Sequence, residues 1–87
     1  MMPKVFEWKG YKFFFFSNEN EPLERCHIHV RKDENVAKFW LNPIIALASS
    51  WGMTSKELKV LEKIIEENQE TIRSKWNEHF SKKSTSR

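Results

Sequence analysis

The feature that most constrains the fold is a long amphipathic pattern in the second half of the chain. Thr54 and Glu57 form the T-x-x-E pattern of a helix capping box, and Met53 is placed to pack against Leu58. The pattern predicts one helix over residues 54–81, of roughly seven turns. An apolar stripe of this length has to be buried, so we expect the helix to cross a sheet. The stripe consists of Leu58, Leu61, Ile65, Ile72, Trp76 and Phe80.

The first half of the chain has the pattern of two antiparallel hairpins. Residues 3–8 and 11–16 are β-rich runs separated by two residues, the second of which is Gly10. This spacing predicts a tight turn with a positive φ at the glycine. Residues 26–32 alternate between apolar and polar side chains, and residues 36–41 alternate in the same way after a polar turn. The sequence therefore predicts an antiparallel sheet of about four strands.

The segment between the predicted sheet and the predicted helix has weaker signals. Asn42-Pro43 ends the last predicted strand, because proline cannot donate a hydrogen bond to a β-ladder. Residues 44–48 then form a short apolar element, for which the sequence leaves a short helix and a fifth strand open. For 87 residues, these patterns predict a single α+β domain. Its expected parts are the sheet 3–41, the connector 42–53, the helix 54–81 and the basic tail 82–87.

Cysteine content and hydropathy bear on the compartment. Cys26 is the single cysteine, so no internal disulfide can form, whereas small secreted domains commonly have several. No apolar run approaches the ~20 residues of a membrane helix, and no N-terminal targeting segment is visible. We therefore expect a cytoplasmic protein that does not associate with membranes. The net charge is +3, and basic residues concentrate near the C-terminus.

Titratable side chains gather on the polar face of the second predicted hairpin. His27 and His29 point the same way from one strand, and Lys38 and Trp40 adjoin them from the other. Histidine can act as a general acid or base near neutral pH, and lysine can stabilise a phosphorane-like charge without a metal ion. His27, His29 and Lys38 are therefore candidate catalytic residues for RNA cleavage. Arg31 and Trp40 are candidate nucleic-acid contacts, through a phosphate and a stacked base.

The same residues also fit simpler roles. A solvated strand face accounts for the two histidines without any catalysis, and Trp40 fits a cross-strand packing role. A zinc site needs four ligands, or three and a water, and the remaining histidine, His79, is expected far away on the helix. We therefore expect no metal and no other cofactor. Cys26 faces away from the histidines and is expected to be a buried, inert thiol.

Several stretches resemble the DUF4160 family, small prokaryotic proteins that share a domain of unknown function. The resemblance rests on His27-Ile28-His29-Val30, Ala37-Lys38-Phe39-Trp40-Leu41, Gly52-Met53-Thr54-Ser55-Lys56-Glu57-Leu58 and Trp76-Asn77-Glu78-His79-Phe80. It extends to residues 10–19 if an extra Phe16 is allowed. The resemblance implies hairpins followed by a helix. It also implies a gene that often lies beside a second small gene, an arrangement suspected of being a toxin and antitoxin pair.

These observations lead to two hypotheses about function. In the first, the chain is the toxin-like member of a two-gene cassette and binds or cuts RNA through the face of His27, His29 and Lys38. Its partner would be an antitoxin-like protein. Whether the chain is an enzyme stays open, and a metal-independent ribonuclease is not favoured over a non-enzyme. In the second, the chain is a non-enzymatic interaction module whose projecting helix end, Trp76 and Phe80, binds a partner protein or a second copy of the chain.

Overall fold

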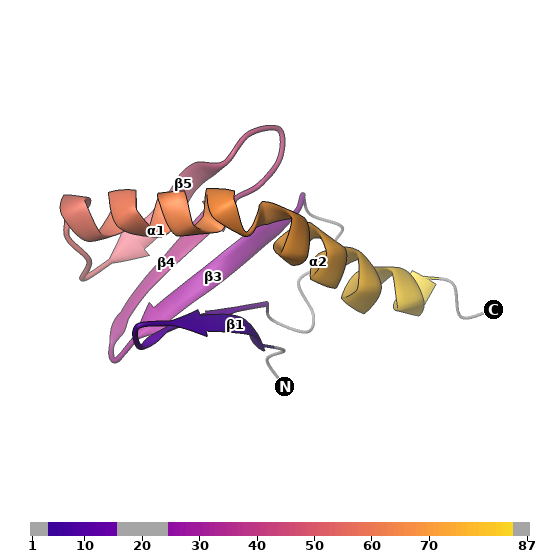
Figure 1. The fold of residues 1–87 in the computed structure, drawn as a ribbon, viewed down its shortest axis with the longest axis horizontal. Coiled ribbons are helices and arrows are strands. Elements are labelled where there is room, and N and C mark those ends of the chain that lie inside the picture. The colour runs from indigo at the N-terminus through magenta and orange to yellow at the C-terminus, as the bar shows by residue number, and fades with distance from the viewer. Residues whose placement is uncertain (1–3, 16–24, 85–87) are drawn as a thin grey trace.

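Each strand of the sheet pairs with its neighbour along the chain. A computed structural model describes residues 4–15 and 25–84, with side chains as far as residue 78. The five-stranded antiparallel sheet has the order β1-β2-β3-β4-β5 and is followed by two helices (Figure 1). The elements are β1 (Lys4–Trp8), β2 (Tyr11–Phe14), β3 (His27–Lys32), β4 (Asn35–Trp40), β5 (Ala46–Trp51), α1 (Ser55–Glu67) and α2 (Gln69–Ser84).

The tight turns of the two predicted hairpins follow from their residues. Lys9 and Gly10 connect β1 to β2 and both have positive φ, 48° and 85°. Positive φ at both central residues is typical of the primed turns, whose twist fits a two-residue hairpin. Asp33, between β3 and β4, has a φ of 56°, a conformation that aspartate tolerates better than most residues. The strand pairings confirm both hairpins.

The sheet has a fifth strand that the sequence left undecided. β5 pairs antiparallel with β4, with an irregularity in register: Lys38 lies opposite Ser49, whereas Phe39 lies opposite Leu47. Ala48 is thus the extra residue of a bulge. The prediction of about four strands is therefore wrong by one edge strand. Most side chains of β5 are exposed, which explains why its sequence lacks the apolar alternation of a half-buried strand.

The C-terminal helix is interrupted at Asn68. α1 ends at Glu67, and α2 begins at Gln69 and continues past the end of the sheet (Figure 1). The side-chain amide of Asn68 donates to the carbonyl oxygen of Ile64 at 2.8 Å, and its φ and ψ of −115° and 17° depart from helical values. The prediction of one continuous helix over 54–81 is therefore wrong. Periodicity missed the break because asparagine caps a helix end without changing the spacing of the apolar residues.

The N-terminal end of α1 is the predicted capping box. Oγ1 of Thr54 accepts a hydrogen bond from the backbone N–H of Glu57 at 3.1 Å, and the Thr54 N–H donates to Oε1 of Glu57 at 2.9 Å. Met53 and Leu58, on either side of the cap, are half-buried and pack against the core. These contacts start the helix at the predicted place and turn its apolar face toward the sheet.

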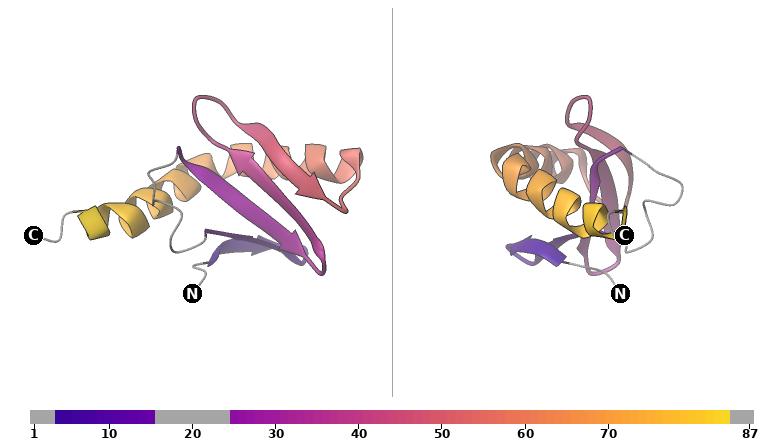
Figure 2. Two further views of the ribbon diagram at one scale, coloured as in Figure 1. Left: turned by 180° about the vertical axis from the view of Figure 1, so that it is seen from behind. Right: turned by 90° about the vertical axis from the view of Figure 1, so that its right-hand side faces the viewer.

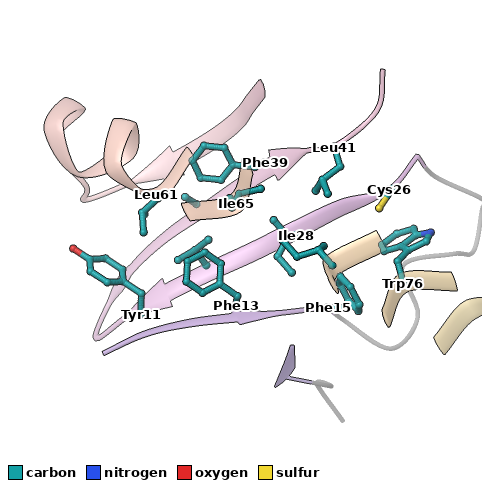
Figure 3. Close-up of a cluster of buried hydrophobic side chains, with 13 residues drawn as sticks. Tyr11, Phe13, Phe15, Cys26, Ile28, Phe39, Leu41, Leu61, Ile65 and Trp76 are labelled. Atoms are coloured by element: carbon teal, nitrogen blue, oxygen red, sulfur yellow. The ribbon is translucent and has the colours of Figure 1, made fainter. Parts of the chain in front are cut away.

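The core lies between the helices and one face of the sheet (Figures 2 and 3). Phe13, Ile28 and Phe39 line the sheet side and are fully buried. Leu61 and Ile65 of α1 are also fully buried and cover them. Full burial of a large apolar side chain contributes about 1.5–3 kcal/mol to stability. The aromatic residues thus let a short chain build a core without a disulfide.

A candidate nucleic-acid interface on the open sheet face

We call the sheet face opposite the core the open face. The core and α1 lie on the other side of the sheet (Figure 2). Because side chains alternate along each strand, the register decides which residues share this face. From β1 to β5, one cross-strand row consists of Glu7, Lys12, Arg31, Val36 and Trp51, and the next consists of Lys4, Phe14, His29, Lys38 and Ser49. His27 and Trp40 form a further pair on the same face.

The structure brings the predicted catalytic residues together but does not expose all of them. His29 lies opposite Lys38 on the neighbouring strand, and the ring centroids of His27 and His29 are 5.2 Å apart. His27, however, is 0% exposed, and its ring contacts Trp40 and Trp76 with centroids 5.5 and 4.9 Å away. The expectation that His27 lies on a solvated strand face is therefore wrong. A buried ring of this kind is out of reach of a phosphate group at the surface.

Trp40 is held between charged side chains of the protein itself. Cζ of Arg25 lies 4.1 Å from the centroid of the Trp40 ring, and Nζ of Lys38 lies 4.4 Å from it. Such cation–π contacts contribute roughly 0.5–1 kcal/mol where solvent is near. A nucleobase would have to displace one of these cations to stack on Trp40. The predicted role of Trp40 as a stacking residue thus competes with an existing packing role.

Arg31 lies at a cationic hollow on the β2–β3 half of the open face. The hollow is lined by Lys4, Gly10, Lys12, Phe14, Arg31 and Asp33. Nε of Arg31 donates to the backbone oxygen of Asp33 at 3.1 Å, which orients the guanidinium, and Lys12 lies directly across from Arg31. Lys4 forms an ion pair with Glu7 at 3.1 Å. Arg31 and Lys12 are exposed and therefore lie where a phosphate group can reach them.

Trp51 is a surface aromatic residue that sequence reasoning missed. Its side chain is 64% exposed, and Val36 directly opposite it on β4 is 41% exposed. Trp51 lines a second hollow of the open face, together with His29, Val36, Lys38 and Ser49. The sequence held no signal for this position because β5 itself was not recognised. Lys12 was also missed, although the alternation of residues 11–14 already turns it away from the core.

The predicted partner surface at the helix end has no exposed ring at Trp76. Trp76 is only 8% exposed, and its ring packs edge-on against Phe15 with centroids 5.2 Å apart. Cys26 lies beside it in the core (Figure 3). Trp76 thus completes the core of its own chain, and its predicted role in binding a partner stays a prediction without an exposed ring to support it. The other predicted contact, the Phe80 side chain, lies outside the described side chains.

The described part of the chain offers no site for a metal ion and no reactive thiol. Among the described side chains of residues 4–15 and 25–78, no group of histidine, cysteine, aspartate and glutamate could hold a metal ion. Cys26 is buried, and burial raises the pKa of its thiol to about 11, although Arg73 opposes the shift. A thiol with this pKa is protonated at neutral pH and is a poor nucleophile. No helix among the described residues is long and apolar enough to cross a membrane.

The fold and the open face define a small α+β domain with a helix-covered antiparallel sheet. In a comparison with known protein families, residues 10–77 match the family described as "Domain of unknown function (DUF4160)". The chain therefore belongs to this family, which confirms the resemblance seen in the sequence. The match spans β2 to β5 and α1, and so includes both rows of the open face. Comparisons with curated proteins and with solved structures give no match.

Proposed function

We propose that this protein binds RNA through its open face, as the toxin-like member of a two-gene cassette. The observation that carries the proposal is the placement of Lys12, Arg31 and Lys38 on a sheet face that α1 does not cover. Phosphate groups are bound mainly by lysine and arginine, and sheet faces that combine such cations with aromatic rings suit RNA. The cassette is proposed from the family alone, because the resemblance to DUF4160 implies a gene that often lies beside a second small gene.

Charge distinguishes the open face from the exposed face of α1. Lys12 and Arg31 are exposed, and Lys38 is half-buried beside Trp40. On α1, by contrast, lysines alternate with glutamates along the exposed positions. The open face also carries the acids Glu7 and Asp33, but its cations outnumber them, and a surface with a cationic excess attracts a polyanion more than an evenly mixed one does. The open face is therefore the better surface for RNA on this chain.

Binding accounts for the geometry better than cleavage does. General acid–base catalysis needs groups within hydrogen-bond reach of the protons that move. Burial removes His27 from such a role, which leaves His29 and Lys38 of the three candidate catalytic residues. The second function class, a non-enzymatic protein-interaction module, has less support at Trp76, because that ring is buried in the core of its own chain.

The proposal is tested by removing the cations of the open face and comparing a matched control. The variant Lys12→Ala/Arg31→Ala/Lys38→Ala should bind RNA more weakly, measured by fluorescence anisotropy over a range of salt concentrations. Each lost phosphate contact should reduce the slope of log K against log salt by about 0.7, so the triple variant should lose about two units. The control is Lys56→Ala/Lys59→Ala/Lys63→Ala, which removes the same charge from exposed positions of α1.

Growth and RNA integrity separate the remaining outcomes. Induction of the wild type in bacteria should arrest growth, the open-face variant should not, and the α1 control should behave as the wild type. Equal losses in both triple variants would mean that net charge, and not the open face, governs binding, and would overturn the proposal. If the wild type cleaves RNA and His29→Ala does not, the protein acts by catalysis and not by binding alone.

A further inference from the structure

Trp51 stands at the outer edge of the open face, in one hollow with Lys38 and in one cross-strand row with Arg31 and Lys12. We infer that the RNA is bound as a single strand, with one unpaired base stacked on Trp51 and the backbone crossing the strands toward Arg31 and Lys12. This inference rests on the proposed function and adds to it the strandedness of the ligand and the position of a base-binding subsite.

The exposure of Trp51 is the first observation that supports a stacking role. A tryptophan in a strand usually buries its ring, yet this one is 64% exposed and lies next to another exposed apolar side chain, Val36. Trp40, by contrast, has Arg25 and Lys38 at its ring. Trp51 is therefore the ring of the open face on which a base can stack without displacing those cations.

The register of the β-strands gives the direction in which the RNA strand crosses the sheet. Trp51, Val36, Arg31 and Lys12 form one row across β5, β4, β3 and β2. Strands in a sheet are about 4.8 Å apart, so the row spans roughly 14 Å from the aromatic end to the cationic end. An RNA strand that crosses the β-strands thus meets Trp51 at one end and the phosphate-binding hollow of Arg31 and Lys12 at the other.

The hollow at Trp51 contains polar groups that can contact a stacked base or its sugar. Lys38 and Ser49 lie opposite each other in the neighbouring row and line the same hollow as Trp51. The ammonium group of Lys38 can bind a phosphate, and the hydroxyl group of Ser49 can donate to or accept from a sugar hydroxyl. Stacking and polar contacts are therefore available within one subsite.

A sharp turn follows Trp51 and constrains the backbone there. Gly52 follows with a φ of +86°, and a Cβ at this position would clash with Oδ1 of Asn35. The chain thus turns sharply against the Asn35 side chain, with Trp51 paired to Val36 by the sheet. The backbone that presents Trp51 is therefore already ordered before a ligand binds, which lowers the entropic cost of binding.

A stacking ring on an open sheet selects single strands over duplexes. In an RNA duplex both faces of each internal base are covered by neighbouring bases, and duplex recognition depends on shape, phosphates and 2′-hydroxyls. An unpaired base can instead lay its face on Trp51. Loss of a base–aromatic stack lowers affinity by about 5- to 150-fold.

The test compares one RNA in two forms. A labelled G·C-rich oligoribonucleotide of about eight nucleotides that is not self-complementary, a length within the usual range of single-strand sites, is titrated alone and annealed to its complement. The wild type should bind the single strand at least tenfold more tightly than the duplex. Trp51→Ala should lose most of this preference, Trp51→Phe should keep most of it, and Ile44→Ala, another exposed apolar residue, should behave as the wild type. Circular dichroism checks the folding of each variant.

The outcomes separate the inference from the proposed function. If both RNA forms bind equally, and binding depends on Lys12 and Arg31 but not on Trp51, the inference fails and the proposed function stands. If the folded wild type binds neither form, the proposed function fails and the inference fails with it. A single-strand preference that survives in Trp51→Ala would place the base elsewhere and would also overturn the inference.

Discussion

The hydroxyl group of Tyr11 donates a hydrogen bond to Oε2 of Glu57 at 2.6 Å, and thereby connects β2 to the first turn of α1. Oε1 of the same carboxylate accepts from the Thr54 N–H in the capping box. Nζ of Lys32 lies 4.7 Å from the centroid of the Tyr11 ring and adds a positive charge near the carboxylate. One carboxylate thus caps the helix and fixes the helix to the sheet.

Tyr11→Phe should lower the melting temperature without changing the fold, because it removes the hydrogen bond to Glu57 and leaves the ring in place. The effect should be smaller than that of Leu61→Ala, which empties a fully buried site and should cost about 2–5 kcal/mol. Thermal unfolding followed by circular dichroism measures both. A Tyr11→Phe protein as stable as the wild type would show that the hydrogen bond contributes nothing net.

The same pair should make stability depend on pH at both ends of the range. The hydrogen bond from Tyr11 lowers the pKa of Glu57 below 4.5, so its contribution is complete above pH 4.5 and is lost as the pH falls through the folded-state pKa. The hydrogen bond to Glu57 raises the pKa of Tyr11 above 10.0, so that contribution is complete below pH 10.0 and is lost at higher pH. Melting temperatures of the wild type and Tyr11→Phe across pH should converge at both extremes.

Gly52→Ala should destabilise the protein through backbone strain and a steric clash. The left-handed conformation at φ +86° costs a residue with a Cβ about 1–2 kcal/mol, and the new atom would also meet the Asn35 side chain. Adding Asn35→Ala should restore the steric part of the loss but not the backbone part. Urea denaturation of the single and double variants measures both parts. If the double variant recovered all of the lost stability, the left-handed conformation at residue 52 would carry no energetic cost for alanine.

Arg73→Ala should loosen α2 from the end of β4. The guanidinium group donates to Oδ1 of Asn42, to the backbone oxygen of Leu41 at 2.8 Å and to Oε1 of Gln69 at 3.3 Å. We expect a loss of about 1–3 kcal/mol in the free energy of unfolding. Arg73→Lys should not restore it, because an ammonium group lacks the planar fork that reaches several acceptors at once. If Arg73→Lys were as stable as the wild type, the interaction would depend on positive charge alone and not on the shape of the guanidinium group.

Trp76→Ala should be among the most destabilising substitutions in the chain. The ring is buried against Phe15 and Cys26, and its removal should cost about 3–5 kcal/mol or unfold the protein. Urea denaturation at two protein concentrations measures the loss. A role in binding a second copy would instead make the loss depend on protein concentration, with little effect on the dilute protein.

The sequence by itself determined those features that depend on a few neighbouring residues. The turn at Gly10, the capping box of Thr54 and Glu57, and the alternation along β3 and β4 all arise from φ preferences and hydrogen bonds within a short span of chain. The common direction of His27 and His29 follows from the same alternation. These local rules place the candidate residues on one strand face before any tertiary contact is known.

The tertiary structure alone decided what covers each face and which strands meet. β5 has little apolar pattern of its own, and pairing with β4 makes it a strand and brings Trp51 beside Val36. His27 obeys the alternation, yet Trp76, far along the chain, buries its ring. Burial and register depend on packing between distant segments, which the spacing of residues along the chain does not encode. For that reason the sequence predicted a polar strand face, and the structure showed which of its side chains a ligand can reach.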